Sequence, residues 1–453
     1  MITLYGKPGE GSLTRRGFLR IGGMAAGGLS LGQLMSIEAR AQAGRTQKAI
    51  INIYMPGGPS HIDMFDPKPE APTDIRGDFD PIGTNVPGIQ VSELFPRMAA
   101  MMDKFVIVRS VVGSEGLHDL YQCMTGRTRK EMKPAGGSWP SMGAWVSRLQ
   151  GEARIGVPPN VHLMYPTGNR TWGEPGDAGF VGQSHAPMAL VSKDPLAKPE
   201  GLSLNGITLD RLQDRDGLRK AVDTFRRETD ASGTMAGLDH FGRQALDILG
   251  TSKLSEALDL SKESPKVLER YGTNDVAYER DGAPFMIRNF LVARRLVEAG
   301  ARVVSLNYGR WDWHGGDGMN TPMSRKWCPE LDRGLTALVT DLHERGLDKD
   351  VSVVLWGEFG RTPRINKQNS RDHWPQVTFA VMAGGGMRTG QVIGSTNARG
   401  EHPKDRPLTP NDLWATVYRH LGVDYEQSFP DHRGRPMPIL PFGSPIEELL
   451  PVA

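Results

Sequence analysis

The chain has 453 residues, of which 54 are Lys or Arg, 52 are Asp or Glu and two are Cys. A formal net charge of +2 argues against a nucleic-acid-binding protein, which normally carries a strongly basic face. Two cysteines exclude a disulfide scaffold and a four-cysteine zinc site, and the length allows one large domain or two to three smaller ones.

Residues 1–43 have the pattern of a twin-arginine signal peptide. Arg15 and Arg16 precede a Phe-Leu pair, a weakly apolar run over 21–37 and the small residues of Ala-Arg-Ala-Gln-Ala at 39–43, which suit cleavage. The alternatives are a chance arginine pair and an uncleaved anchor, but the run is shorter than the ~20 residues that a spanning helix needs. We predict export to the periplasm or beyond by the twin-arginine translocation machinery, with no stable membrane span after cleavage.

Removal of this segment changes the charge of the protein. It holds five Lys or Arg and two Glu, so the body that remains has a net charge of −1. We expect residues 44–453 to form a single domain that binds no nucleic acid.

Short, continuous apolar runs in the body are typical of buried strands, and they lie at 48–55, 105–110, 301–307, 351–356 and 377–382. Apolar residues at helical spacing predict helices between them, at 284–299, 328–344 and 409–421. Apolar strands separated by helices indicate an α/β fold with a mostly parallel sheet covered on both faces. Two stretches depart from this rhythm: 130–210 is predicted to be loop-rich, and 210–275 to be a helical insertion.

In an open α/β sheet, ligands bind beyond the carboxyl ends of the strands. Carboxylates and imidazoles follow three of the predicted strands or precede a fourth, and they are Asp63, Asp66, Asp312, His314, Glu358 and His373. Such mixed sets suit one or two divalent ions, with Zn, Mn and Ca as candidates. Each residue also has a structural alternative, for example Asp63 as a cap, Glu358 paired with Arg361, or Asp312 and His314 as loop caps.

These segments together resemble a known family. The export signal, the Gly-Gly-Pro-Ser-His-Ile-Asp block at 57–63, Trp-Asp-Trp-His-Gly-Gly at 311–316, Gly-Glu-Phe-Gly-Arg-Thr-Pro at 357–363 and Arg-Asp-His-Trp-Pro at 371–375 resemble the exported bacterial family called domain of unknown function 1501. That family is similar in fold to the alkaline phosphatase and sulfatase superfamily. The resemblance implies a three-layer sandwich and transfer of phosphoryl or sulfuryl groups at one or two metal ions.

The resemblance also implies roles for individual residues. Asp63, or less well Asp66, matches the first metal ligand of the superfamily, and the other implied ligands are Asp312, His314, Glu358 and His373, with His402 a poorer match. Phe359 stands where relatives carry a His.

The position of the superfamily nucleophile falls near Gly116, which has no side chain. Ser114 could take that role, a metal-bound water could attack directly, or the site could be inactive. We name Ser114, His118 and Arg361 as candidate catalytic residues, with Arg361 or Arg109 neutralising the anionic group of the substrate.

Two functions remain open at this point. The first is an exported metal-dependent hydrolase of sulfate or phosphate esters, with a sulfated polysaccharide as one possible substrate. The second is a non-catalytic, metal-stabilised binding or assembly protein of the cell envelope. The pairing of Cys123 with Cys328 is also open, although Cys123 is expected in the core.

Overall fold

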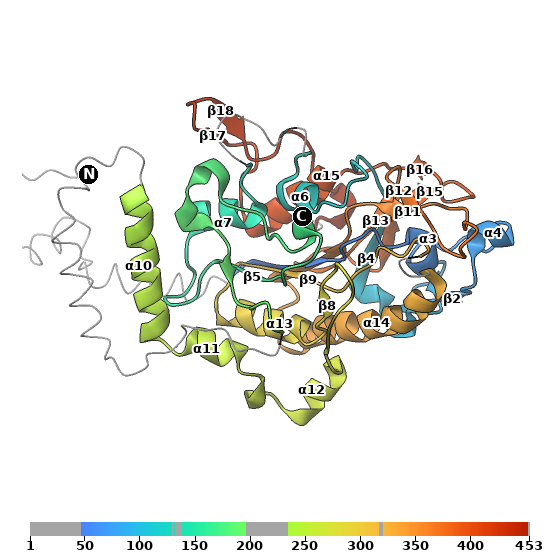
Figure 1. Cartoon of the computed structure of the whole chain (residues 1–453), viewed down its shortest axis with the longest axis horizontal. Helices are drawn as coiled ribbons and strands as arrows, with labels where there is room; N and C mark the ends of the chain where they lie inside the picture. The colour runs from blue at the N-terminus through green and yellow to red at the C-terminus, as the bar shows by residue number, and fades with distance from the viewer. Residues whose placement is uncertain (1–46, 129–130, 132–137, 196–233, 317–319, 452–453) are drawn as a thin grey trace, which may run out of the picture. The chain divides into compact units, whose positions relative to one another are not determined.

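The computed structural model describes residues 47–128, 131, 138–195, 234–316 and 320–451 (Figure 1). The predicted signal peptide at 1–43 and the part of the predicted helical insertion at 210–233 lie outside the described residues. The chain from Lys48 onward forms one compact unit.

An eight-stranded sheet runs through this unit in the order β14-β4-β13-β10-β1-β9-β5-β6. The bounds of these strands are β1 Ala49–Tyr54, β4 Phe105–Val111, β5 Asn160–Leu163, β6 Met188–Ala189, β9 Val303–Asn307, β10 Val351–Trp356, β13 Thr378–Gly384 and β14 Gln391–Ile393. β1 is parallel to both of its neighbours, so Ile51 lies between Val304 and Val353. Each predicted apolar run forms a strand of this sheet, and the predicted mostly parallel α/β fold is confirmed.

Helices cover both faces of the sheet, as Figure 1 shows. Ile51 and Ile53 of β1 face a core that α13 (Asn289–Ala299) and α14 (Asn320–Glu344) complete. Their neighbours Ile50 and Tyr54 face a second core formed with α7 (Met142–Gln150) and α15 (Pro410–Leu421). Side chains alternate between the faces of a strand, so a strand buried on both faces must be apolar throughout. This confirms the three-layer arrangement.

Smaller elements connect these layers. The short helices are α3 His61–Met64, α4 Thr73–Arg76, α5 Pro96–Ala99 and α6 Tyr121–Thr125. The two-stranded ribbons are β2 Pro81–Gly83 with β3 Gln90–Ser92, β7 Asp275–Tyr278 with β8 Pro284–Phe285, β11 Gly360–Arg361 with β12 His373–Trp374, β15 Ser395–Thr396 with β16 Pro403–Asp405, and β17 Ser428–Pro430 with β18 Pro436–Pro438.

One predicted segment differs in detail from the structure, and the described part of another has the predicted character. The stretch 130–210, predicted to be loop-rich, also contains α7 and the buried strand β5. β5 has only four residues, too few for a periodicity to stand out from the sequence. The described part of the 210–275 insertion contains α10 Thr234–Gly250, α11 Lys253–Leu258 and α12 Pro265–Tyr271, in agreement with its predicted helical character.

Strand direction determines which loops meet. β1, β4, β9 and β10 are mutually parallel, so they end at one edge of the sheet, which we call the carboxyl edge. β13 is antiparallel to β4 and β10 and therefore begins at that edge. The loops that follow four strands and the segment that precedes β13 thus converge on one region.

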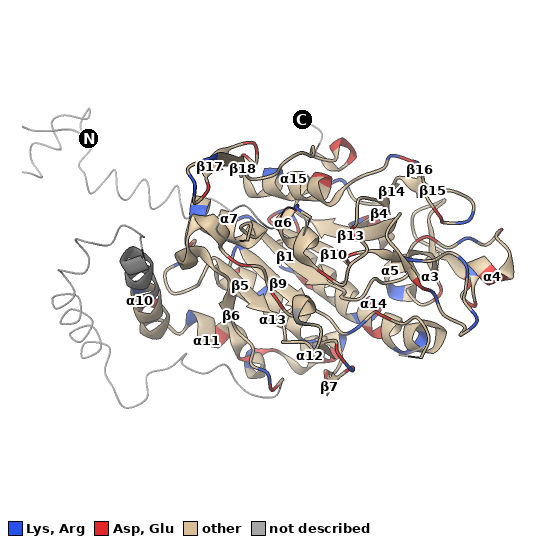
Figure 2. Ribbon diagram, turned by 45° about the horizontal axis from the view of Figure 1, so that its top comes forward, with Lys and Arg blue, Asp and Glu red and all other residues tan. Residues whose placement is uncertain are grey.

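The charged residues are spread over the unit, with basic and acidic side chains interspersed along the outer helices and loops (Figure 2). None of the helices in the described ranges combines the length and the apolar character that crossing a membrane requires.

Candidate functional site

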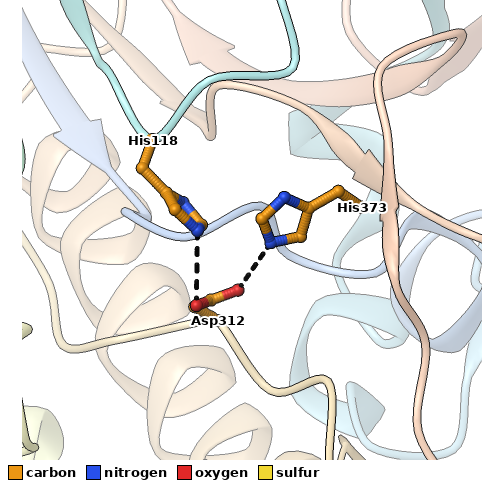
Figure 3. A group of neighbouring side chains, drawn as sticks. All are labelled: His118, Asp312 and His373. Carbon is orange, nitrogen blue, oxygen red and sulfur yellow. Dashed lines mark hydrogen bonds and ion pairs between the residues drawn. The ribbon is translucent and has the colours of Figure 1, made fainter.

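His118, Asp312 and His373 meet at the carboxyl edge (Figure 3). His118 follows β4, Asp312 follows β9, and His373 lies in β12, shortly before β13. Their ligand atoms all lie within 4.8 Å of one another. In the described part of the chain, this is the one group of at least three His, Cys, Asp or Glu side chains close enough to hold a metal ion.

The carboxylate of Asp312 is the centre of this group. Its Oδ1 lies 3.0 Å from Nε2 of His373, and its Oδ2 lies 3.1 Å from Nε2 of His314 and 3.4 Å from Nε2 of His118. Three imidazoles therefore face one buried carboxylate. His118 and His373 keep 28% and 33% of their side chains exposed, so a molecule in solution can reach the imidazole side of the group.

Two arginines also hold Asp312. Nη2 of Arg361 lies 2.5 Å from Oδ1, and Nη2 of Arg310 lies 3.2 Å from Oδ2. Burial alone would raise the pKa of Asp312, but the hydrogen bond from His373 and the charge of Arg361 together lower this pKa far below its usual range. Asp312 is therefore an anion over the physiological pH range.

Glu358, two residues beyond the end of β10, lies beside the group. Its Oε1 accepts hydrogen bonds from the backbone N–H of Gly57 at 2.8 Å and from Nε1 of Trp172 at 2.9 Å, and lies 3.7 Å from Nδ1 of His118. Oε2 is buried and has no hydrogen-bond partner among the residues that the structure describes. An unpartnered buried carboxylate oxygen is costly, and a bound cation would satisfy it.

The residues present therefore fit a divalent metal. Two imidazole nitrogens and the Asp312 carboxylate form the mixed donor set that Zn and Mn accept, and the unsatisfied carboxylate oxygen of Glu358 lies beside this set. Aromatic rings pack beside the imidazoles and limit how the imidazoles can rotate. The ring centroid of Phe359 lies 4.6 Å from that of His373, and the ring centroid of Trp172 lies 4.8 Å from that of His118.

Arg361 does not have the position expected of a substrate-binding arginine. Its side chain is 1% exposed, and its guanidinium donates to acceptors on five residues, namely the carbonyl oxygens of Gly57, Gly58, Trp311 and Arg371 and the carboxylate of Asp312. The structure thus gives Arg361 a positioning role in place of the predicted contact with an anionic substrate. It joins the loops after β1 and β9 to the segment before β13.

Asp63, predicted as a metal ligand, is not in the group either. Its carboxylate accepts hydrogen bonds from Arg371, from Oγ of Ser60 at 2.6 Å and from Nδ2 of Asn320 at 2.7 Å. The short helix α3, capped by the Ser60 hydroxyl, carries Asp63 into this structural ion pair. We therefore do not retain Asp63 as a ligand.

The other carboxylate after β1, Asp66, also has structural partners. It accepts a hydrogen bond from Lys68 at 2.9 Å and another from Thr396 at 2.5 Å. Arg109, the second candidate for neutralising a substrate, lies 3.6 Å from Asp66 and donates to the carbonyl oxygens of Phe65 and Gln90. His402 is exposed, and its ring lies against Trp374.

Ser114 lies beside the group, but its hydroxyl is already engaged. Its Oγ donates to the carbonyl oxygen of Glu358 at 2.6 Å and accepts from the backbone N–H of Gly116 at 3.1 Å. Ser114 and Glu358 line a small shared pocket. Gly116 has a φ of +68°, and a Cβ there would lie 3.1 Å from Pro375.

Both cysteines are buried and free, so the structure contains no Cys123–Cys328 disulfide. Cys123 lies in the core between the sheet and α15, as expected. Burial raises the pKa of both thiols well above the usual range, which leaves them protonated.

Arg310 was not predicted from the sequence as a residue of the site, and neither was the contact of Trp172 with Glu358. Arg310 lies two positions before Asp312 in the same strand-end segment, and this proximity could have pointed to it. Trp172 lies in the loop-rich stretch, where no local pattern indicates that its N–H reaches Glu358.

Fold and site together define a mixed α/β protein with a candidate divalent-metal centre at the carboxyl edge of its sheet. Residues 47–450 match the family described as "Protein of unknown function (DUF1501)", and the chain belongs to that family. No curated protein matches the chain.

Several solved structures are similar to the chain at low identity. The PsFucS1 sulfatase from Pseudoalteromonas sp. is 13% identical, with 87% of this chain and 70% of that chain covered and a TM-score of 0.36. The zinc complex of the C-terminal periplasmic domain of EcEptC from Escherichia coli is 10% identical, with 90% and 93% covered and a TM-score of 0.34. The phosphonate monoester hydrolase SpPMH from Silicibacter pomeroyi is 10% identical, with 88% and 78% covered and a TM-score of 0.36. Likeness at this level assigns neither an activity nor a ligand to this chain.

Proposed function

We propose that this protein is an exported, metal-dependent hydrolase of sulfate or phosphate esters, with a sulfated polysaccharide as one possible substrate. The observation that carries the proposal is the convergence of His118, Asp312 and His373 at the carboxyl edge, beside the unsatisfied oxygen of Glu358. Export rests on the twin-arginine pattern of residues 1–43, and the ester substrate rests on the motif resemblance.

His118, Asp312 and His373 would hold the ion, with Glu358 and His314 next to it. When bound, a divalent ion would supply polarisation of an ester oxygen and a lowered pKa of water. The protein holds the ligands in place: Arg361 and Arg310 fix the Asp312 carboxylate, and Trp172 and Gly57 fix Glu358.

Water is the attacking group in this proposal, because the Ser114 hydroxyl already donates a hydrogen bond to the carbonyl oxygen of Glu358 and Gly116 has no side chain. The water oxygen forms the new bond to sulfur or phosphorus while the bond to the alcohol oxygen breaks. The departing alkoxide takes the proton that the water loses. His118 and His373, partly exposed on the imidazole side, are the side chains that an ester group would meet first.

The second candidate is a non-catalytic, metal-stabilised binding or assembly protein. It is favoured by the engagement of Ser114 and by the burial of Arg361, which together leave neither a free nucleophile nor a free anion-binding arginine at their predicted positions.

A paired measurement distinguishes the two candidates. Mature protein is analysed for bound metal and assayed with aryl sulfates and aryl phosphates in the presence of Zn²⁺, Mn²⁺ or Ca²⁺. A hydrolase loses turnover in His373→Ala and Glu358→Gln while its melting temperature changes little. A metal-stabilised binding protein shows no turnover in any form and loses metal and melting temperature in the same variants.

The exposed His402 provides the matched control, since His402→Ala removes an imidazole that is not part of the group. Purified protein that retains no divalent metal and turns over none of these esters would contradict the hydrolase proposal.

A further inference from the structure

Arg310 lies between two carboxylates, one inside the candidate site and one outside it. Its Nε donates to Oδ1 of Asp281 at 2.6 Å, while its Nη2 lies 3.2 Å from Oδ2 of Asp312. Its Nη1 donates to the backbone carbonyl oxygen of Asp312. The guanidinium is buried, whereas the Asp281 side chain is 45% exposed.

Backbone packing holds this arrangement in place. Asp281 lies in the loop between β7 and β8, and the backbone N–H of Ala283 donates to the carbonyl oxygen of Gly309, next to Arg310. Gly282 permits the approach, because a Cβ at this position would lie 2.3 Å from Cβ of Arg310. The Asp281 loop is thus docked on the strand-end segment that carries Asp312.

The guanidinium occupies the side of Asp312 that a metal would use. Oδ2 of Asp312 faces Nε2 of His118 and Nε2 of His314, the same oxygen that Arg310 approaches. The fixed positive charge of Arg310, 3.2 Å from Oδ2 of Asp312, would repel a divalent cation bound there. In a partly buried site, water screens this repulsion only weakly. Without a counter-ion, Arg310 would therefore lower the affinity of the site for metal.

We propose that Asp281 is a positioning residue that sets the affinity of the site for cations. It neutralises the positive charge of Arg310 and holds the Arg310 guanidinium in place beside it when Asp312 binds metal. This inference rests on the proposed function, since it assumes that the His118, Asp312 and His373 group binds a divalent ion. Asp281 itself does not contact the ion. Its effect passes through Arg310.

The test is a titration of the full mature protein with Zn²⁺ against a chromophoric chelator. Asp281→Asn keeps the shape of the side chain but removes its charge, and should weaken Zn²⁺ binding by about tenfold. Asp281→Glu retains the charge and should restore the affinity, which a purely structural role of the loop would not predict. Melting temperatures of the metal-free proteins should be similar, because the Asp281 side chain is half exposed and Arg310 keeps Asp312 as a counter-ion.

Glu279→Gln is the matched control, since it removes one carboxylate from the same loop but not from the Arg310 ion pair. If Asp281→Asn binds Zn²⁺ as tightly as the wild type, or if Glu279→Gln weakens binding equally, the inference is overturned while the proposed function stands. If the wild type binds no divalent metal at all, the proposed function fails and this inference fails with it.

Discussion

Arg371 and Asp63 form a buried ion pair between segments 308 positions apart in the chain. Nε of Arg371 donates to Oδ2 of Asp63 at 2.7 Å, and Nη2 donates to Oδ1 at 2.9 Å. The pair ties α3, directly after β1, to the segment that carries His373 toward Asp312. Burial would raise the pKa of Asp63, but Arg371 outweighs it and lowers this pKa below its usual value.

Breaking this pair should be strongly destabilising. Arg371→Met leaves the Asp63 carboxylate buried without its counter-ion, and the free energy of unfolding should fall by about 3–5 kcal/mol, measured by denaturant titration at neutral pH. The exposed Arg406–Glu448 pair is the control, since Arg406→Met should cost no more than about 1 kcal/mol. Equal effects of the two substitutions would show that burial of the pair is not what matters.

Gly57 should be essential to the geometry of the site. It has a φ of +107°, its N–H donates to Glu358, and a Cβ there would lie 2.5 Å from the backbone nitrogen of Asp312. Gly57→Ala should therefore displace Asp312 and reduce both the melting temperature and Zn²⁺ affinity. Gly88 also has a positive φ, but a Cβ there would meet nothing within 4 Å.

Gly88→Ala should thus lower the free energy of unfolding by about 1–2 kcal/mol through backbone strain alone. Gly57→Ala should cost a further 1–3 kcal/mol or so from overpacking, measured by denaturant titration. Zn²⁺ affinity should fall only in Gly57→Ala, and loss of affinity in both variants would refute the steric explanation.

Lysine should not replace Arg361. The ammonium group of Arg361→Lys keeps the charge but cannot supply the planar set of donors that the surrounding carbonyl oxygens now share. Carbonyl oxygens left without a donor should lower the free energy of unfolding by about 1–3 kcal/mol. Zn²⁺ affinity should also fall, because Asp312 loses the guanidinium contact that fixes its carboxylate. Arg364→Lys, at an exposed position nearby, should change neither quantity, and a stable Arg361→Lys protein with unchanged affinity would contradict the positioning role.

Acid should destabilise the protein partly through His162. Burial of the ring in β5 lowers the pKa of this imidazole from 6.5 to about 4. The unfolded chain therefore binds a proton more readily than the folded one. The stability contributed by the neutral ring is complete above pH 6.5 and is lost as the pH falls toward 4, by about 1.4 kcal/mol per pH unit.

His162→Gln should remove this part of the pH dependence. The difference in unfolding free energy between the wild type and the variant should shrink as the pH falls through that window, in denaturant titrations at several pH values. Burial also lowers the pKa of His61 and His420, so the variant should keep some sensitivity to acid. Parallel pH profiles of wild type and variant would show that His162 does not titrate in this way.

The sequence alone determined the layers of this protein. A strand covered on both faces has no polar side, so the run 351–356 could be recognised as a strand, and its predicted bounds are those of β10. Helical spacing of apolar residues similarly predicted the helices that cover the sheet. The rule that ligands bind beyond the carboxyl ends of strands then placed Asp312 and Glu358 near one edge. These inferences succeed because burial on a given face imposes a pattern on residues that are neighbours in the chain.

Tertiary structure decided which of those side chains meet. The antiparallel direction of β13 brings His373 to the carboxyl edge, and no local pattern specifies that direction. Asp63 follows a strand just as Asp312 does, yet Arg371, 308 positions away, pairs with it and removes it from the candidate ligands. The near-zero net charge of the sequence likewise gives no sign that two buried arginines, Arg310 and Arg361, contact the same carboxylate, that of Asp312. Pairing between side chains depends on distances across the folded chain, and these distances exist only once the sheet has formed.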